Sequence, residues 1–185
     1  MPRALRADAE RSTARILEAA DRLLRGNPEA TLEQIADAAG VARSTVHRRF
    51  ASRAALLAAL TSLVNDRLRE VVARARPETA PPLVALHQLT DVALTLKVDW
   101  RFAVDLTGDG TTEDSTLDPA VLTGLTTAFS RACEEGLIRP DLDTDWVLRI
   151  YFALMHEAAV RPGGEDAHTR AQDVLDVFLH GVGPR

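Results

Sequence analysis

Cations and hydroxyl groups are concentrated in one short segment of this sequence, residues 43–53, which reads RSTVHRRFASR. If the segment is helical as far as Phe50, Val46 and Phe50 fall on its buried side. The other side chains of its first two turns then point to solvent: Arg43, Ser44, Thr45, His47 and Arg48. An arginine can donate two parallel hydrogen bonds to guanine, and hydroxyl groups can bind bases or phosphates. These residue types on one helical face therefore favour contact with double-stranded DNA.

The preceding segment predicts the helix that must hold this face in place. Thr31 followed by Gln34 is a capping box, in which a hydroxyl and an amide each satisfy a free backbone N–H group. Ala36 and Ala39 are small enough for two helices to cross closely, and Gly40 can adopt the left-handed conformation that ends a helix. A helix-turn-helix is therefore predicted. The alternative, a solvated charged helix in an all-α protein, leaves the coincidence of these signals unexplained.

Residues of both helices resemble the N-terminal signature of the TetR (tetracycline-repressor-like) transcriptional regulators, over roughly the first third of the chain. The matching residues are Thr31, Ile35, Ala36, Ala39, Gly40, Val41, Thr45, Phe50, Ser52, Leu56 and Leu57. The resemblance implies that the second helix enters the major groove of an operator. Residue types and resemblance together give the expected DNA-binding set: Thr31, Arg43, Ser44, Thr45, His47, Arg48, Arg49 and Arg53.

Several positions depart from the usual pattern of that family. Ala42 stands where a serine cap is common, which weakens the start of the helix by about 1 kcal/mol. His47 replaces a tyrosine, so operator binding is expected to depend mildly on pH near neutrality. Arg53 keeps a cation where the family holds a phosphate, and Ser52 can cap the helix that follows.

Charge divides the chain into two unlike parts. Residues 1–76 contain 14 arginines and nine acids, a net charge of +5, whereas residues 77–185 contain eight cations and 18 acids, a net charge of −10. A basic front part suits phosphate neutralisation, and an acidic remainder is repelled from DNA. The alternative is that charge only keeps both parts in solution. We expect a helix-turn-helix domain at 1–52, a connecting helix at 53–76 and a ligand-binding and dimerisation domain at 77–185.

Helical spacing predicts an all-α fold of about nine helices, with a three-helix DNA-binding domain followed by a helical ligand-binding and dimerisation domain. The first helix is expected at about residues 9–25, with its buried stripe from Ile16 to Leu24, and a long helix at 53–75 ends before PETAPP. The helices expected beyond them cover about 82–97, 99–106, 118–135, 144–161 and 166–180.

The run WVLRIYFALM, residues 146–155, is apolar on nearly every side, so a helix there must be covered twice. One cover can be the core of the chain and the other a second copy, which predicts a homodimer joined by a four-helix bundle. The expected interface residues are Trp146, Ile150, Leu154, Val174, Leu175, Phe178 and Leu179. The alternative is a monomer in which this helix is internal.

Apolar and aromatic side chains of the second part can also converge on a pocket for a small-molecule effector. The candidate residues are Leu86, His87, Thr90, Trp100, Phe102, Phe129, Cys133, Tyr151, Phe152, Met155 and His156. Plain core packing explains the same residues equally well. The two histidines also fit core or surface positions that touch no ligand.

Other kinds of chemistry have little support in the sequence. The five histidines and the single cysteine, Cys133, lack the spacing of a zinc site, and no phosphate-binding glycine loop or nucleophile motif is present. We therefore expect no metal, no cofactor and no enzymatic activity. No apolar run is long enough to cross a bilayer and no signal-peptide core is found, which predicts a cytoplasmic protein with no membrane partner.

The resulting hypothesis is a homodimeric DNA-binding regulator, a repressor released from its operator by a small molecule, as the resemblance implies. Two alternatives stay open: an all-α enzyme with an appended helix-turn-helix, and a DNA-binding protein that binds no ligand. The effector, the operator, the regulated genes and the choice between repression and activation are not encoded in any pattern of this sequence.

Overall fold

The computed structural model describes residues 3–108, 116–163 and 165–182, and over these residues the chain forms nine helices and no strand. The all-α class predicted from helical spacing is confirmed. The helices are α1 (Arg3–Gly26), α2 (Leu32–Ala39), α3 (Arg43–Arg49), α4 (Arg53–Ala75), α5 (Pro82–Asp99), α6 (Arg101–Thr107), α7 (Pro119–Glu134), α8 (Thr144–Val160) and α9 (Ala167–Val182). Within these ranges, no helix combines the length and the apolar character that a bilayer crossing requires.

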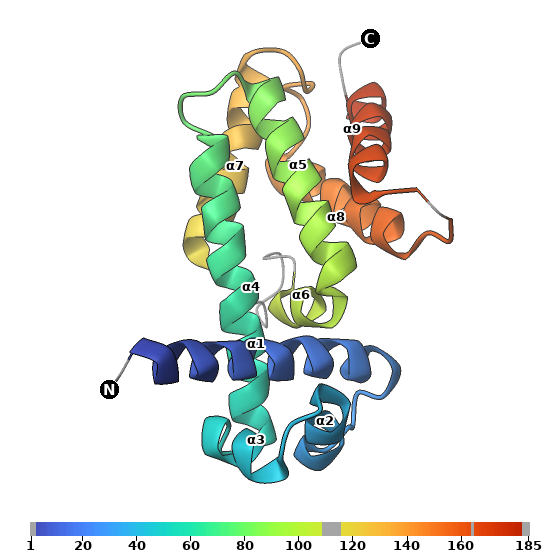
Figure 1. Ribbon diagram of the computed structural model, residues 1–185. Helices are drawn as coiled ribbons and strands as arrows, with labels where there is room; N and C mark the ends of the chain where they lie inside the picture. Colours follow the sequence, from blue (N-terminus) through green and yellow to red (C-terminus); the bar gives the residue numbers. More distant parts are fainter. Residues whose placement is uncertain (1–2, 109–115, 164, 183–185) are drawn as a thin grey trace.

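Helices α1 to α3 form a small unit at one end of the molecule, which we call the reader (Figure 1). Ile16 and Leu24 of α1, Ile35 of α2 and Val46 of α3 are fully buried and make its core. The first helix begins at Arg3, six residues earlier than predicted. The prediction started at the buried stripe, but Ala, Leu and Arg before it are strong helix formers and extend the helix.

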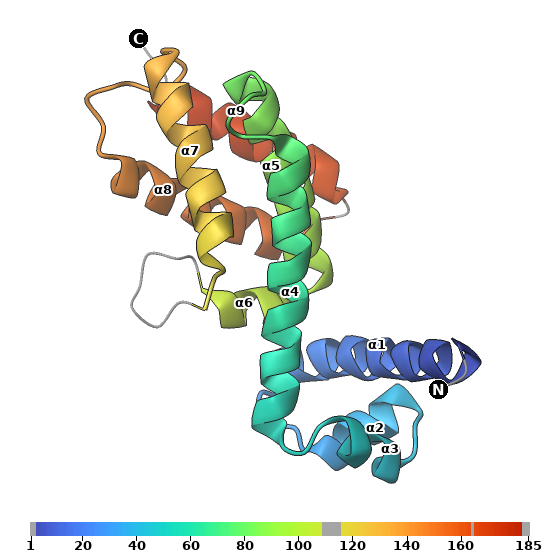
Figure 2. The ribbon, with the colours of Figure 1, turned by 90° about the vertical axis from the view of Figure 1, so that its left-hand side faces the viewer.

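Helix α4 connects the reader to the remaining helices, and Figure 2 shows it rising from the reader to lie beside α5 and α7. Its 23 residues span about 34 Å at about 1.5 Å per residue. The Ser52 hydroxyl accepts a hydrogen bond from the Ala55 amide at 3.1 Å, so the predicted cap is confirmed. Leu56, Leu60 and Val71 are buried at successive positions along it, and Val71 also lines a space shared with the later helices. The two parts therefore share one continuous helix.

Three of the remaining helices, α7, α8 and α9, meet at a cluster of aromatic rings. The ring centroids of Phe129 (α7) and Tyr151 (α8) lie 5.0 Å apart, and Phe178 (α9) lies 5.7 Å from Phe129, all in edge-to-face geometry. Phe129 and Phe178 are among the largest fully buried side chains. The helices predicted beyond residue 82 all begin and end within two residues of their predicted positions.

A glycine sets the distance between α4 and α7, which lie side by side in Figure 2. A Cβ atom placed on Gly124 of α7 would lie 2.3 Å from Cγ1 of Val72 on α4, far inside van der Waals contact. The two helices can therefore pack this closely only because residue 124 has no side chain.

Candidate functional site

The two helices of the helix-turn-helix are held by the local interactions that the sequence predicts. The Gln34 amide donates to the Thr31 hydroxyl at 3.3 Å and the Thr31 amide donates to the Gln34 side chain at 2.9 Å, which completes the capping box. Gly40 adopts the left-handed conformation with φ of 62°. Arg15 of α1 donates to the Ala39 carbonyl at 2.9 Å and so fastens the turn to the first helix. These hydrogen bonds fix the position of the turn on α1 and α2.

Helix α3 turns one side to the core of the reader and the other to solvent. Val46 is fully buried and Phe50, which ends the helix, is 5 % exposed. Arg43, Ser44, His47, Arg48 and Arg49 are exposed and Thr45 is half-buried. Ala42 occupies the N-cap position without any side-chain hydrogen bond, as the sequence predicts. The outward face of α3 is therefore polar and basic along its whole length.

Two of the exposed cations are paired with acids of α2. Nη2 of Arg43 lies 3.4 Å from Oδ2 of Asp37, and Nε2 of His47 lies 3.1 Å from Oε1 of Glu33. A hydrogen bond from its own backbone N–H group, then bonds with Thr31 and His47, hold the pKa of the Glu33 carboxyl below its ordinary value. Ion pairs this open to water contribute little to stability, so a phosphate can replace either acid.

Arg48 differs from these two residues. Among the residues that the structure describes, it has no acidic partner within ion-pair distance, and its side chain is exposed. Its guanidinium group is therefore available to DNA without breaking an existing contact.

Three other members of the expected DNA-binding set have neighbours outside the exposed face of α3. The Thr31 hydroxyl is engaged in the capping box. Arg49 lies beside a second, smaller groove that it shares with α1 and with Arg67 of α4. Arg53 is half-buried and donates to the Pro28 carbonyl, while its buried Nε has no hydrogen-bond partner within the described part of the chain. Thr31 and Arg53 therefore already have partners within the chain, whereas Arg49 is exposed at the end of α3 beside this groove.

A cavity of about 570 Å³ lies among α4 to α8. Its walls are mostly apolar, with charged groups at a few points. The lining residues are Leu68, Val71, Val72, Leu89, Ala93, Lys97, Val104, Asp105, Thr107, Gly108, Leu117, Val121, Leu125, Arg149, Tyr151, Phe152, Ala153, Met155, His156 and Glu157. A volume of this size is typical of pockets for drug-sized ligands.

Four of the residues expected in a pocket line this cavity, namely Tyr151, Phe152, Met155 and His156. The others lie outside it. Leu86 and Phe129 belong to the core, Thr90 is buried, Cys133 is half-buried and His87 is exposed on α5. Trp100 and Phe102 lie at the corner between α5 and α6, where the guanidinium of Arg67 lies 5.3 Å from the Trp100 ring centroid.

Helices α4 and α6 contribute cavity residues that the sequence analysis missed, among them Leu68, Val71 and Val72 on α4 and Val104 and Thr107 on α6. The signal available was the apolar stripe of α4, which continues past the reader with helical spacing. The sequence analysis identified this segment only as a connecting helix.

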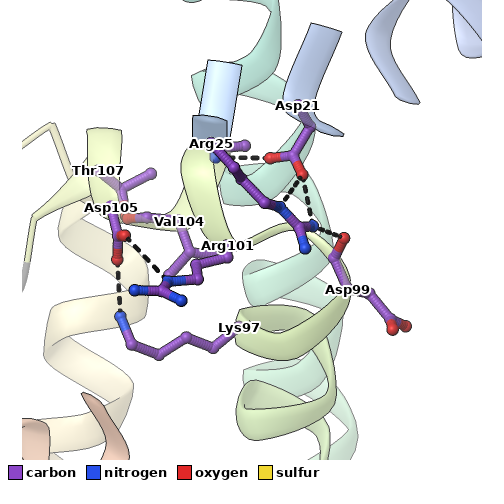
Figure 3. Close-up of polar contacts among 9 residues, drawn as sticks. Asp21, Arg25, Lys97, Asp99, Arg101, Val104, Asp105 and Thr107 are labelled. Carbon is purple, nitrogen blue, oxygen red and sulfur yellow. Dashed lines mark hydrogen bonds and ion pairs between the residues drawn. The ribbon is translucent and has the colours of Figure 1, made fainter. Parts of the chain in front are cut away.

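Two polar groups of the cavity wall, the Tyr151 hydroxyl and the Lys97 ammonium, are already bonded to other side chains. The Tyr151 hydroxyl lies 3.1 Å from the Thr90 hydroxyl, and Thr90 donates to the Leu86 carbonyl at 2.7 Å. Burial raises the pKa of Tyr151 to about 12, with the Thr90 hydrogen bond acting in the opposite direction, so the phenol stays neutral. Nζ of Lys97 lies 3.0 Å from Oδ1 of Asp105 across the α5–α6 corner (Figure 3). The cavity therefore offers mainly apolar surface to a ligand.

The expected dimer residues divide into two groups. Trp146 is 56 % exposed on α8, and Ile150, Leu154 and Leu179 are half-buried. Val174, Leu175 and Phe178 are buried within the single chain, because α9 packs this stripe against α5 and α8. In the single chain these three side chains are covered by α5 and α8, so they are not available to a second copy. Val177, which is 58 % exposed, is the large apolar residue on the outer side of α9.

A helix-turn-helix with a basic outer face, joined by one helix to a helical domain with an apolar cavity, defines a class of DNA-binding regulators. The comparisons with known proteins agree. Residues 16–60 match the model of a family described as "Bacterial regulatory proteins, tetR family". The chain is 35% identical over 184 residues to the transcriptional repressor LfrR of Mycolicibacterium smegmatis, covering 94% of this chain and 91% of LfrR. This chain belongs to the TetR family of transcriptional regulators.

A second relative and a solved structure extend this result. The transcriptional regulator NfxB of Pseudomonas aeruginosa is 28% identical over 165 residues, which cover 84% of this chain and 86% of NfxB. The crystal structure of LfrR from Mycobacterium smegmatis in complex with proflavine superposes with a TM-score of 0.68 at 27% identity, covering 95% of this chain and 98% of that one.

Proposed function

We propose that this protein is a homodimeric repressor that binds an operator through α3 and leaves it when a small apolar molecule occupies the cavity. The observation that carries the proposal is the combination of an exposed basic helix and a separate apolar cavity, joined by the single helix α4. Because the relatives are named as regulators, we also infer that the chain has no catalytic activity.

The DNA contacts are assigned to the outward face of α3. Arg48 is the residue proposed to contact a base edge, because it is exposed and carries no acid within the described part of the chain. Arg43 and His47 would exchange Asp37 and Glu33 for phosphates or bases. In a two-fold dimer the two copies of α3 would lie about 34–36 Å apart, one turn of the duplex.

The dimer is proposed to form through the outer sides of α8 and α9. Trp146 and Val177 are both more than half exposed. A contiguous apolar surface of this kind marks a site of interaction with another protein. Together with half-buried Ile150 and Leu154, they would give each copy an apolar surface that a second copy can cover.

The effector is proposed to be a compact, mostly apolar or aromatic compound. The cavity offers the rings of Tyr151 and Phe152 and the side chain of Met155, and the Tyr151 hydroxyl is already bonded to Thr90. The relative LfrR is described in complex with proflavine, a planar aromatic compound, which supports this class.

Footprinting on the DNA that flanks the gene for this protein tests the proposal. We expect a protected palindrome with half-sites about one helical turn apart.

Light scattering tests the dimer. It should give twice the mass of the chain for the wild type and the mass of a single chain for Trp146→Glu. A screen of apolar aromatic compounds, proflavine included, should contain ligands that raise the melting temperature and abolish the footprint. Absence of a footprint at low salt would contradict the proposed function.

A further inference from the structure

One carboxylate is buried where the reader meets the cavity domain. Asp21 of α1 is 1 % exposed, and among the described residues it is the one buried acid. Its Oδ1 accepts a hydrogen bond from the Ala103 amide of α6 at 2.8 Å, across 82 residues of sequence. Its Oδ2 accepts from Nε and Nη2 of Arg25 at 3.0 and 2.6 Å. Figure 3 shows this arrangement.

Arg25 extends the contact to a second helix. Its guanidinium also donates to the carbonyl of Asp99, the last residue of α5. Asp21 and Arg25 therefore bind both sides of the α5–α6 corner, the end of one helix and the start of the next. We call this set of hydrogen bonds the α1 joint.

The same corner forms part of the cavity. Val104, Asp105 and Thr107 line it from α6, and Lys97 lines it from α5. The ion pair between Lys97 and Asp105 closes the corner from the cavity side. Helix α6 has only seven residues, so a displacement of Val104 or Thr107 also moves the Ala103 amide. Residues that would touch a ligand and the amide that binds Asp21 thus lie within two turns of one helix.

We propose that the α1 joint transmits occupancy of the cavity to the reader, with Asp21 as the positioning residue. This inference rests on the proposed function. A buried carboxylate is strongly disfavoured without its hydrogen-bond partners, so α1 follows α6 when α6 moves. Helices α2 and α3 pack on α1 and α2, respectively, and are carried with it. Helix α4 links the two parts covalently, and the α1 joint adds a second connection at a different point.

The test is a cycle of binding measurements on the full-length dimer and the duplex identified by footprinting. Proflavine is the probe, and its binding to the protein is measured from its fluorescence in the absence of DNA. Because proflavine also intercalates into duplex DNA, release is taken as the loss of duplex binding beyond the loss that proflavine causes in Ala93→Trp, whose cavity is filled. In the wild type we expect proflavine to weaken duplex binding about tenfold or more. In Asp21→Ala, proflavine and the duplex should each still bind alone within about threefold of wild type, but release should fall below about threefold. Asp21→Asn keeps an acceptor for the Ala103 amide and should restore most of the release.

Matched controls separate coupling from stability. Asp143 also caps a helix of the cavity domain, accepting from the Trp146 amide at 3.0 Å, but no contact with α1 is found for it among the described residues. Asp143→Ala should lower the melting temperature and leave release intact.

A substitution that fills the cavity can replace the ligand. Ala93→Trp fills the cavity from α5 and should weaken duplex binding without any probe. In the double variant, Asp21→Ala should suppress that effect.

A second variant keeps the inference testable if Asp21→Ala does not fold. Arg25→Ala removes the hydrogen bond to the Asp99 carbonyl and leaves the Ala103 amide bonded to Asp21. This variant also removes both hydrogen bonds to Oδ2 of Asp21, which lowers the stability of the protein. Because the Arg25 side chain is 32 % exposed, water can reach Oδ2 in its place and the protein should still fold, with a lowered melting temperature. Release should again fall below about threefold, and release of wild-type magnitude in this variant would overturn the inference.

The outcomes distinguish this inference from the proposed function. Normal release in Asp21→Ala would overturn the role of the α1 joint and leave the repressor proposal standing. If neither proflavine nor Ala93→Trp weakens duplex binding in the wild-type background, the effector response fails and the inference fails with it.

Discussion

The outer face of α3 and the walls of the cavity differ in how much water reaches their side chains. On α3 the arginines and His47 are exposed, and the acids that pair with two of them are themselves partly or largely exposed. In the cavity all but one of the apolar side chains are buried or half-buried, and the Tyr151 phenol bonds to Thr90. The first surface suits binding by exchange of charged partners, which salt weakens. The second suits binding by removal of apolar surface from water, which salt affects little.

The largest expected effect separates the core beside the cavity from the outer face of α3 by stability. Phe129→Ala removes a fully buried ring that touches Tyr151 and Phe178, so it should cost about 3–5 kcal/mol of unfolding free energy. Chemical denaturation checks this value. Arg48→Ala is the matched surface variant and should leave the unfolding free energy nearly unchanged. An equal loss in both variants would contradict the division drawn above.

Arg48→Ala should lower the affinity for the duplex by about 1–3 kcal/mol, because an exposed guanidinium is lost from the face of α3. Fluorescence anisotropy at several salt concentrations gives both the affinity and the salt slope. The control is Arg74→Ala, which removes an exposed arginine of α4 that pairs with Glu70. Similar losses in both variants would indicate a general charge effect and would remove Arg48 from the site.

Ala42→Ser should stabilise the start of α3 by about 1 kcal/mol. Ala42 already has the extended backbone of an N-cap residue, with φ −64° and ψ 140°, but it offers no side-chain acceptor. Tighter duplex binding with unchanged specificity is expected, because less ordering of α3 is required on contact. Ala38→Ser, an exposed substitution inside α2, provides the control. No change in affinity or in melting temperature would show that α3 is already fully ordered.

The smallest effect is expected from Glu33→Gln. The pKa of Glu33 is lowered in the folded protein, so its ionised form stabilises the reader above the ordinary carboxyl pKa. This contribution is lost as the pH falls through the lowered value. Melting curves of wild type and variant should therefore differ at neutral pH and converge in acid. A difference that grows on acidification would reverse the sign and contradict this assignment. Duplex affinity at neutral pH should rise slightly, because His47 loses a competing acid.

The reader was predictable because short-range signals determine it. Thr31, Gln34 and Gly40 act within a few residues of themselves, and Val46 and Phe50 mark the buried side of α3 by spacing alone. The structure confirms these local features. The cavity depends instead on which helical stripes meet one another. Sequence spacing identified Tyr151 and Met155 as inward-facing, but it could not distinguish the cavity from the core at Phe129 or Leu86.

Contacts between distant parts of the chain explain the remaining differences. Val174, Leu175 and Phe178 form an apolar stripe that suits a dimer interface as well as an internal contact, and only the packing of α9 on α5 and α8 decides between them. Asp21 has no sequence signal at all, because its partner Ala103 lies 82 residues away and contributes a backbone amide.

The missing side chain at residue 124 has a consequence for the range of molecules that the protein can respond to. Val72 packs directly against Gly124 and also forms part of the cavity wall. The spacing of α4 and α7 thus limits the bulk of an incoming compound. Substitutions at Val72 and Gly124 would therefore change the size of compound that the cavity accepts, and they lie outside the exposed face of α3.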